Sequence, residues 1–257
     1  MNKHLLLLTA ATLCIGLAPA FAQPGPPPGA SGFDGAMRKL FGENVAFAAT
    51  LETRIKPKSD DLIIMPGKIS FDSGRTRVEM NLADARGIKF PPGSIDQMKS
   101  MGLDQMITIS LPAKKSAFLI YLGLKSYVEN PLPAAVSATN LNFKVTMTEL
   151  GRETIAGHPC VQNKVLVTDA AGTTNEFTVW NATDLKKFPM KIFRGGPDAD
   201  VTMLFTDVSL TKPAANLFDP PAGFTRYDNV QTMMRTEIMK KMGGGLGLPP
   251  AGAPELH

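Results

Sequence analysis

Methionines are the residues in this chain whose type and spacing come closest to metal chemistry. Met98 and Met101 lie three residues apart, as do Met239 and Met242, and Met233-Met234 adds two more. Thioether sulfur is a soft ligand that favours Cu(I), so one alternative function is a periplasmic soft-metal (copper) binder that uses Met-rich helices. Sites of that kind usually add His or Cys to the methionines, and these segments contain neither.

Catalytic groups are sparse. The sequence contains no Gly-x-Ser-x-Gly elbow, no His-Glu-x-x-His helix and no Gly-rich phosphate loop. His158 and Cys160 lie two residues apart, but Pro159 between them indicates a turn or the start of a strand rather than a catalytic pair. Asp60-Asp61 is interpreted as a solvated turn. We therefore predict a protein that is not an enzyme, with no catalytic residue, no bound metal and no cofactor.

The first 22 residues have the pattern of a signal peptide. Lys3 precedes an apolar stretch of about 13 residues, and Ala20-Phe21-Ala22 supplies the small-x-small cleavage pattern. A membrane-spanning helix needs roughly 20 apolar residues, and no segment of the chain reaches that length. The sequence predicts cleavage after Ala22 and a protein located in the periplasm or secreted, without a transmembrane segment.

Composition then divides the remaining chain. Residues 23–32 and 243–257 are rich in Pro and Gly, and both are predicted to be disordered arms. Residues 33–242 are long enough for a single domain with its own core. Without Lys3 the chain has 26 basic and 23 acidic side chains, a net charge of +3, which is too mild to indicate nucleic-acid binding. Cys160 is the single cysteine after the leader, so no internal disulfide is expected.

Residues 151–192 are the clearest structural signal. They are predicted to form successive strands, with residues 161–168 rich in β-branched side chains and residues 169–172 forming a hairpin connection. An antiparallel meander of this kind builds one large curved sheet.

The N-terminal half is predicted to contain further strands. Residues 45–55 alternate, with Val45 placed on the apolar face together with Phe47. Residues 62–71 are expected to be interrupted by a bulge or an edge at Pro66-Gly67. A turn at residues 72–74 then leads into the strand 75–80, one side of which should face water.

Three short helices are expected, over residues 33–41, 95–101 and 230–242. Ser94 and Gln97 are predicted to form a capping box at the start of the second helix, and Gly102 to end it. Further strands are predicted at 106–111, 116–122, 142–150 and 201–210. The total of about nine or ten strands, without a β-α-β rhythm, predicts a mainly β fold: an unclosed antiparallel barrel, or strongly curved sheet, covered by short helices.

Three segments resemble the bacterial outer-membrane lipoprotein carrier superfamily. They are the strand 75–80 after its hairpin, the pattern in residues 179–192, and the close of residues 207–224 with its Leu-Phe and Pro-Pro-Ala-Gly-Phe. Residues 151–167, with Gly-His-x-Cys, are more similar to a poorly characterised secreted branch of that fold. The resemblance implies an unclosed β-barrel wrapped around helices, with an apolar cavity that holds acyl chains in relatives. The Pro-rich arms and Met-rich helices depart from the carriers, so the carriers' partners are not transferred.

The favoured function is therefore binding of an apolar ligand in the half-barrel cavity: a lipid, an acyl chain, or an apolar segment of an envelope protein. Met is flexible enough to line a site of loose specificity. The helix 95–101 is expected to act as a lid over the open side. A competing interpretation is that the same side chains simply fill the core. A further alternative is an envelope sensor or scaffold that acts by protein contact. The predicted cavity lining is Phe47, Phe71, Val78, Met80, Met98, Met101, Phe118, Trp180, Met203 and Phe205.

Overall fold

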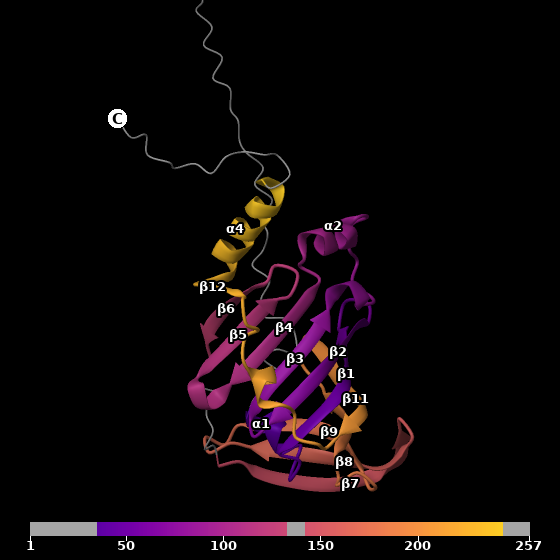
Figure 1. Cartoon of the computed structure of the whole chain (residues 1–257). Coiled ribbons are helices and arrows are strands. Elements are labelled where there is room, and N and C mark those ends of the chain that lie inside the picture. The colour runs from indigo at the N-terminus through magenta and orange to yellow at the C-terminus, as the bar shows by residue number, and fades with distance from the viewer. Residues whose placement is uncertain (1–34, 133–141, 244–257) are drawn as a thin grey trace, which may run out of the picture.

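The computed structural model describes residues 35–132 and 142–243, and Figure 1 shows their arrangement. In these ranges twelve strands form one sheet, accompanied by three α-helices and three short 3₁₀ turns. The strands are β1 (Ala46–Pro57), β2 (Ile63–Asp72), β3 (Arg75–Asn81), β4 (Gln105–Leu111), β5 (Ser116–Tyr121), β6 (Ser126–Pro131), β7 (Lys144–Ile155), β8 (His158–Thr168), β9 (Thr174–Ala182), β10 (Pro189–Arg194), β11 (Ala199–Ser209) and β12 (Thr225–Tyr227). The helical elements are α1 (Gly35–Lys39), α2 (Ser94–Met101), α4 (Val230–Gly243), η1 (Leu82–Asp84), η2 (Pro112–Lys114) and η3 (Ala215–Phe218).

The strand order is β12-β6-β5-β4-β3-β2-β1-β11-β10-β9-β8-β7. Two meanders, β1 to β6 and β7 to β11, are joined by the antiparallel pair of β1 and β11. Only the short β12 runs parallel to its neighbour, β6. β12 and β7 form the two ends of the order, so the sheet curves without closing. The expectation of a mainly β, unclosed antiparallel barrel with short helices is confirmed.

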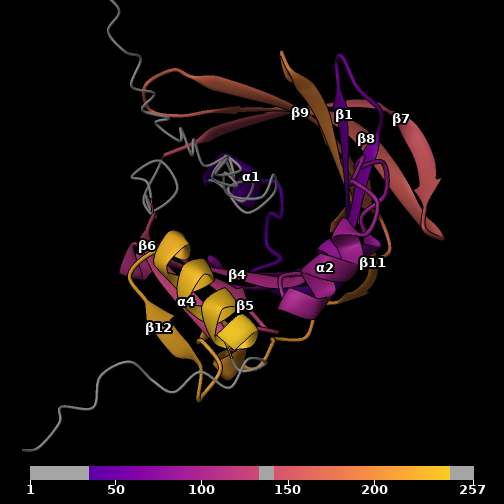
Figure 2. The ribbon, with the colours of Figure 1, turned by 90° about the horizontal axis from the view of Figure 1, so that it is seen from above.

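The concave face is built by strict alternation. In an antiparallel sheet, residues directly opposite each other point to the same face, so one row can be followed from strand to strand. Met65 lies opposite Thr53, Thr53 opposite Met203, and Met203 opposite Ile192, which continues the row to Val179. All five side chains in this row are buried. Seen from above, the strands curve around α1, while α4 and α2 lie on the near rim (Figure 2).

Aromatic rings fill the interior around α1. Phe41, which follows α1, stacks on Phe47 with ring centroids 4.8 Å apart. Its ring also lies 5.6 Å from that of Phe188 and 5.7 Å from that of Phe205. Phe71 completes the cluster at 5.2 Å from Phe47. Gly42 follows with φ of 55°, a left-handed value that ends the helical segment, as the sequence predicted.

The outer face of β4 and β5 carries a second, smaller core. It contains Ile107, Ile109 and Ile120, and Phe218 of η3 covers it. The Arg75 guanidinium lies 4.4 Å from the centroid of the Phe218 ring, so a charged strand residue helps to hold the covering segment. The chain after β11 therefore crosses the outside of the sheet before it reaches β12.

Of two predictions about the first strands, the one for Val45 is wrong and the one for Pro66-Gly67 is half right. β2 pairs with β1 through Pro66 and Gly67 without a register shift, so there is no bulge. Its pairing with β3 begins only at Gly67, which leaves Pro66 at a local edge. A side chain at Gly67 would place a Cβ 2.4 Å from the Glu79 carbonyl oxygen, so the glycine permits close approach of the strands. Val45 precedes β1 and is 62% exposed, because the alternation begins only at Ala46.

The predicted capping box is also wrong. The N-cap of α2 is Gly93, with φ of 78° and no side-chain cap, and Ser94 is the first helical residue. The Ser94 hydroxyl donates to the Pro91 carbonyl at 2.6 Å, and the helical ladder starts with Gln97 N donating to the Gly93 carbonyl. The strands β6 and β12 were not predicted.

None of the helices in residues 35–132 and 142–243 is both long and apolar enough to cross a membrane. The predicted signal peptide (1–22), the first arm (23–32) and all of the predicted tail except Gly243 lie outside the described residues.

Candidate functional site

The candidate site is the part of the concave face near the rim, which we call the inner wall: Val78, Met80, Met106, Leu119 and Tyr121. Met80 of β3 lies opposite Met106 of β4, and Met106 lies opposite Tyr121 of β5. Four of these side chains are buried, and Leu119 is half-buried. The inner wall is therefore a continuous apolar surface on three neighbouring strands.

Two hydroxyl groups interrupt this apolar surface. Tyr121 is only 5% exposed, and its hydroxyl forms no hydrogen bond with a described residue. Burial raises the pKa of the Tyr121 phenol, so it is a neutral donor at physiological pH. Thr108, between Val78 and Leu119 in the pairing, has a buried Oγ1 that also lacks a partner among the described residues. A buried hydroxyl without a partner is costly, so the Thr108 hydroxyl is suited to receive a polar group of a ligand, and the Tyr121 hydroxyl can donate to the same group.

Helix α4 packs against β6 and β12, next to the inner wall. Its Met233 is fully buried in the main core, and Glu237 is 9% exposed. The Glu237 carboxylate accepts hydrogen bonds from the Tyr227 hydroxyl and from Lys240 Nζ, the latter at 2.9 Å. Burial acts to raise the pKa of Glu237, but the hydrogen bonds from Tyr227 and Lys240 outweigh it and hold the pKa below its ordinary value. The helix is thus attached to β12 through a charged contact.

Helix α2 lies at the same rim as α4 and is held much more loosely. None of its eight residues is buried, and Ile95, Met98 and Met101 are half-exposed. Its end is fixed by a backbone contact, because a Cβ on Gly102 would lie 2.7 Å from the Gly123 carbonyl carbon. Lys241 of α4 donates to the Met101 carbonyl at 3.0 Å, so the two rim helices meet there.

The structure places the ten predicted lining residues in different surroundings. Six lie on the concave face, two lie on α2, Phe118 lies on the outer face, and Trp180 belongs to the main core but faces Lys191. The concave-face residues are Phe47, Phe71, Val78, Met80, Met203 and Phe205. Within this group the phenylalanines pack around α1, while Val78 and Met80 belong to the inner wall.

Phe118 and Trp180 do not share the concave face. Phe118 packs into the second core on the outside of β5, with its ring 5.9 Å from that of Tyr127. Trp180 lies opposite Lys191, whose ammonium is 3.9 Å from the centroid of the indole ring, and its Nε1 donates to Glu153 at 2.7 Å. The residue before Trp180, Val179, is the one that points inward.

Sequence reasoning missed Met106, Tyr121 and Met233. Met106 and Tyr121 lie in strands that were predicted, and their inward direction follows from alternation once the pairing of β4 with β5 is known. Met233 lies in the predicted helix 230–242, but it was not expected to face the core; its neighbours Val230 and Met234 are half-exposed. The missing information was the direction from which α4 approaches the sheet.

His158 and Cys160, the polar residues considered as a catalytic pair, make contacts within the fold. His158 Nδ1 lies 3.0 Å from Asp184 Oδ2, while the Cys160 thiol donates to the His158 carbonyl. Burial raises the pKa of the Cys160 thiol, which suppresses the reactive thiolate. No group of three His, Cys, Asp or Glu suited to a metal ion occurs among the residues that the structure describes.

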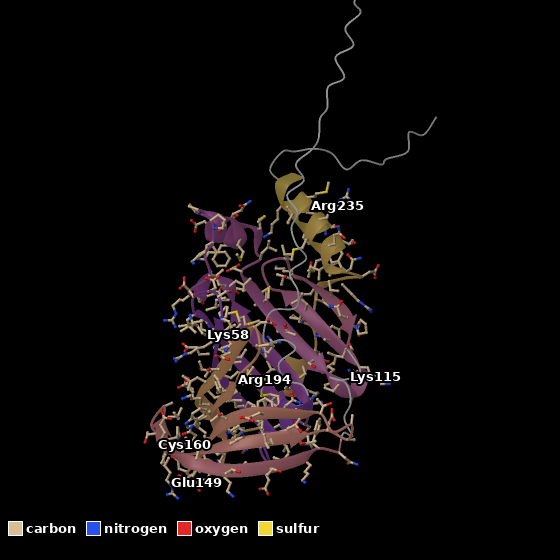
Figure 3. All side chains as sticks on the ribbon, turned by 180° about the vertical axis from the view of Figure 1, so that it is seen from behind. Lys58, Lys115, Glu149, Cys160, Arg194 and Arg235 are labelled. Atoms are coloured by element: carbon tan, nitrogen blue, oxygen red, sulfur yellow. The ribbon has the colours of Figure 1, made fainter. Side chains whose placement is uncertain are left out.

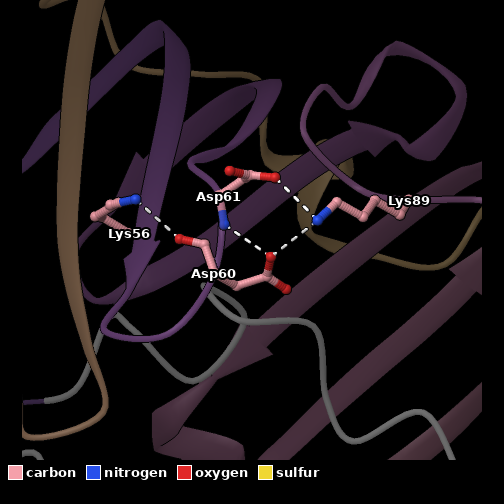
Figure 4. Close-up of polar contacts among 4 residues, drawn as sticks. All are labelled: Lys56, Asp60, Asp61 and Lys89. Atoms are coloured by element: carbon pink, nitrogen blue, oxygen red, sulfur yellow. Dashed lines mark hydrogen bonds and ion pairs between the residues drawn. The ribbon is translucent and has the colours of Figure 1, made fainter.

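The acidic pair after β1 is a solvated turn, as interpreted from the sequence. Lys89 Nζ lies 3.4 Å from Asp60 Oδ1 and 3.0 Å from Asp61 Oδ2, so one ammonium neutralises both carboxylates (Figure 4). Lys56 Nζ donates to the Asp60 carbonyl at 2.8 Å. All four residues are largely exposed or half-exposed.

The methionines proposed for copper are spread over different environments. Met233 is fully buried, whereas Met239 is 61% exposed. Met98 and Met101 are half-exposed on α2, and the side chain of Met242 lies outside the described set. Copper(I) binding therefore stays a prediction without support from this arrangement.

Comparison with known proteins identifies resemblance at the level of the fold. No family profile matches the sequence, and no curated protein matches it significantly. The structure is similar to a LolA superfamily protein from Nitrosomonas europaea, with 7% identity, a TM-score of 0.39, and coverage of 74% of this chain and 96% of that one. It is also similar to the lipoprotein LppX from Mycobacterium tuberculosis, with 9% identity, a TM-score of 0.38, and coverage of 74% and 98%. LprF from Mycobacterium bovis follows, with 14% identity, a TM-score of 0.35, and coverage of 74% and 98%.

The resemblance to the lipoprotein carrier superfamily suggested by the sequence therefore recurs in the structure, at low identity and low TM-score. Similarity at this level gives no information about a ligand, which has to be inferred from the side chains of this chain.

Proposed function

We propose that this protein binds an apolar ligand, such as an acyl chain, against the inner wall beneath α2 and α4, and that it does so after export without catalysing a reaction. The observation that carries the proposal is the unequal cover of the concave face. Around α1 the interior is filled by packed phenylalanine rings. At the rim, α2 has no buried residue, and none of its apolar side chains packs against the main core.

The chemistry of the inner wall supports an amphiphilic ligand. Met80 and Met106 provide flexible, polarizable contacts that adapt to chains of different shape. The Tyr121 hydroxyl is a neutral donor held within this apolar surface. A ligand with an apolar chain and one acceptor oxygen, such as an acyl ester or a fatty acid, would satisfy both features.

The role of α2 in this proposal is that of a displaceable cover. Two turns of helix are marginally stable alone, so α2 depends on its few contacts with the rim. Ile95, Met98 and Met101 are its apolar residues, and all three keep part of their surface in water. An entering acyl chain gains by burying that surface, at about 25 cal/mol for each Å² removed from water.

Replacing both Met98 and Met101 with Glu tests the proposal. We expect uptake of a fluorescent fatty-acid analogue to be lost, because two carboxylates cannot be buried against the chain, while the circular-dichroism signal of the sheet is retained. The matched control is Met239→Glu, a change at a methionine that is 61% exposed on α4, and it should leave uptake unchanged.

Unchanged uptake in the double variant would exclude α2 as part of the site. Unfolding of the domain would mean that the two methionines are core residues, which is the competing interpretation. Native mass spectrometry of protein purified from its own envelope should reveal the natural ligand as a co-purified lipid.

A further inference from the structure

The two ends of the sheet are finished in different ways. β12 is three residues long and packs against α4, so that end is short and covered. β7 is twelve residues long, contains no proline, and most of its residues are exposed. It is the last strand in the order, so its outer main-chain groups have no strand partner among the described residues (Figure 1). A long open edge of this kind is a ready template for pairing with another strand.

Apolar side chains continue onto this edge. Val145 is 43% exposed, and Met147 and Leu150 are each 55% exposed. These three are half of the six large hydrophobic residues exposed in the described part of the chain. Val145 and Met147 lie opposite the buried Val167 and Val165 of β8, so they extend the apolar concave face to its margin.

A bulge at Leu150 arranges the charges on this edge. The register against β8 shifts between Glu149 and Gly151, which brings Glu149 and Arg152 onto the same face although they are three residues apart. Arg152 Nε lies 3.5 Å from Glu149 Oε1 within the strand, and the two side chains are 78% and 55% exposed. Figure 3 labels Glu149 on this outermost strand.

We propose that two copies of this chain join edge to edge, by antiparallel pairing of β7 with β7 about a two-fold axis between Leu150 and Gly151. In this register Glu149 faces the partner's Arg152, and Arg152 faces the partner's Glu149. Antiparallel neighbours that lie opposite each other share a face, so both ion pairs form on the concave side. The two concave faces then form one continuous surface.

Charge complementarity selects a second copy over other extended segments. Charged residues normally keep an edge strand from pairing, because a random partner does not match them. Glu149 immediately precedes Leu150, and Arg152 immediately follows Gly151. The two opposite charges therefore lie at equal distances along the chain from the midpoint between Leu150 and Gly151. A two-fold axis at that point places each charge opposite its complement without any further requirement. A foreign segment would need the same two charges at the same spacing.

Charge reversal on the purified full-length protein tests the proposal. The unmodified protein is expected to sediment as a concentration-dependent dimer. Glu149→Arg gives an edge with two arginines, and Arg152→Glu gives one with two glutamates, so each variant repels its own copy. Each should raise the dimer dissociation constant about tenfold or more, because two attractive contacts become repulsive in the symmetric interface.

Mixing the two variants is the decisive step. An equimolar mixture of E149R and R152E should restore a dimer containing one copy of each, since every arginine then faces a glutamate. The double variant E149R/R152E should also regain self-association. Glu176→Arg, a reversal on β9 where the native side chain is 60% exposed, is the control and should leave the dimer unchanged.

Three outcomes would overturn the proposal: an unmodified protein that remains monomeric, single reversals that leave the dimer intact, or single reversals that separate it without recovery on mixing. Circular dichroism of each variant shows whether the fold is retained, and the exposure of both side chains leads us to expect that it is. Amide hydrogen exchange adds an independent measurement, because pairing should protect β7 amides in the dimer and the monomeric variants should lose that protection.

Discussion

Glu237 illustrates how a buried carboxylate can attach a helix to a sheet. Its partners come from β12, through Tyr227, and from the next turn of α4, through Lys240. Removing the charge replaces the carboxylate by a weaker acceptor for the Tyr227 hydroxyl and the Lys240 ammonium. Because Met233, one turn earlier, is fully buried, loosening Glu237 also loosens the cover of the inner wall.

Glu237→Gln should lower the free energy of unfolding at neutral pH by about 1–3 kcal/mol, the usual size of a hydrogen bond to a charged group. The folded-state pKa of Glu237 lies below its ordinary value of 4.5, so its contribution is complete above that pH and is lost as the pH falls through the folded-state pKa. Urea unfolding between neutral pH and pH values below 4.5 should therefore show a flatter pH dependence for the variant.

The control for this measurement is Glu176→Gln, which removes an exposed ion pair with Lys164. Surface pairs of this kind are worth less than about 1 kcal/mol. Equal losses for the two variants, or an unchanged pH dependence in Glu237→Gln, would contradict the role assigned to Glu237.

Individual residues also mark the limit of what the sequence can predict about the site. Val78 and Met80 were correctly placed on one face, because their strand follows a tight turn and alternates without irregularity. Trp180 was predicted to line the cavity, but it faces Lys191, while its neighbour Val179 faces Ile192 on the concave row. Trp180 is 7% exposed and still belongs to the main core, so burial of both neighbours hides the alternation that would have chosen between them.

Helix α2 is positioned by glycines rather than by apolar packing. Gly93 and Gly102 both have left-handed φ values, of 78° and 72°. Only Gly102 touches another backbone, at Gly123 in the turn before β6. Substituting Gly93 changes only the backbone conformation, whereas substituting Gly102 changes both the conformation and the contact with Gly123. Comparing the two losses of stability therefore separates these two contributions.

Gly93→Ala should cost about 1–2 kcal/mol, the penalty for a left-handed residue with a side chain. Gly102→Ala should cost about 1–3 kcal/mol more, because its Cβ would collide with Gly123 and push α2 from the rim. Chemical denaturation measures both losses, and amide exchange in α2 should rise only for Gly102→Ala. If the two variants lose the same stability, the contact with Gly123 does not hold the helix.

The strands were predicted better than the connections between them. The meander in residues 151–192 follows from its β-branched runs and its Asp-Ala-Ala-Gly turn, whose Asp169 side chain accepts from Ala171 N at 2.9 Å. β12 could not be foreseen, because three residues after a proline-rich crossing carry no periodic signal, and their parallel pairing with β6 is set by the distant packing of η3. Pro66 lies just before the first residue that pairs with β3, where its missing N–H costs no ladder bond, so the sequence indicated the local edge but not the unbroken pairing with β1.

Phe41 connects α1 to most of the interior. It is 1% exposed and contacts rings from β1, β2, the segment before β10, and β11. An unclosed barrel has no partner sheet to fill its centre, so a residue that lies outside the sheet must do so. The packing around α1 therefore determines whether the curved sheet keeps its shape.

Phe41→Ala should lower the free energy of unfolding by about 3–5 kcal/mol, because it removes a ring and leaves a cavity bordered by four others. Val45→Ala, four residues later and 62% exposed, is expected to change stability by less than about 0.5 kcal/mol. Thermal and urea unfolding can measure both. A loss for Phe41→Ala no larger than that of the control would show that the ring cluster does not hold the sheet in its curve.

The order in which the chain can assemble follows from the pair of β1 and β11. All other pairs within the two meanders join strands that are neighbours in sequence, whereas this one joins residues 46–57 to residues 199–209. Closing so long a loop is slow, because chain entropy is lost before any contact across the seam forms. Each meander alone is an open sheet with one exposed apolar face. The chain therefore acquires an interior only after β11 is available to pair with β1, and until then that face is exposed to chaperones and to aggregation.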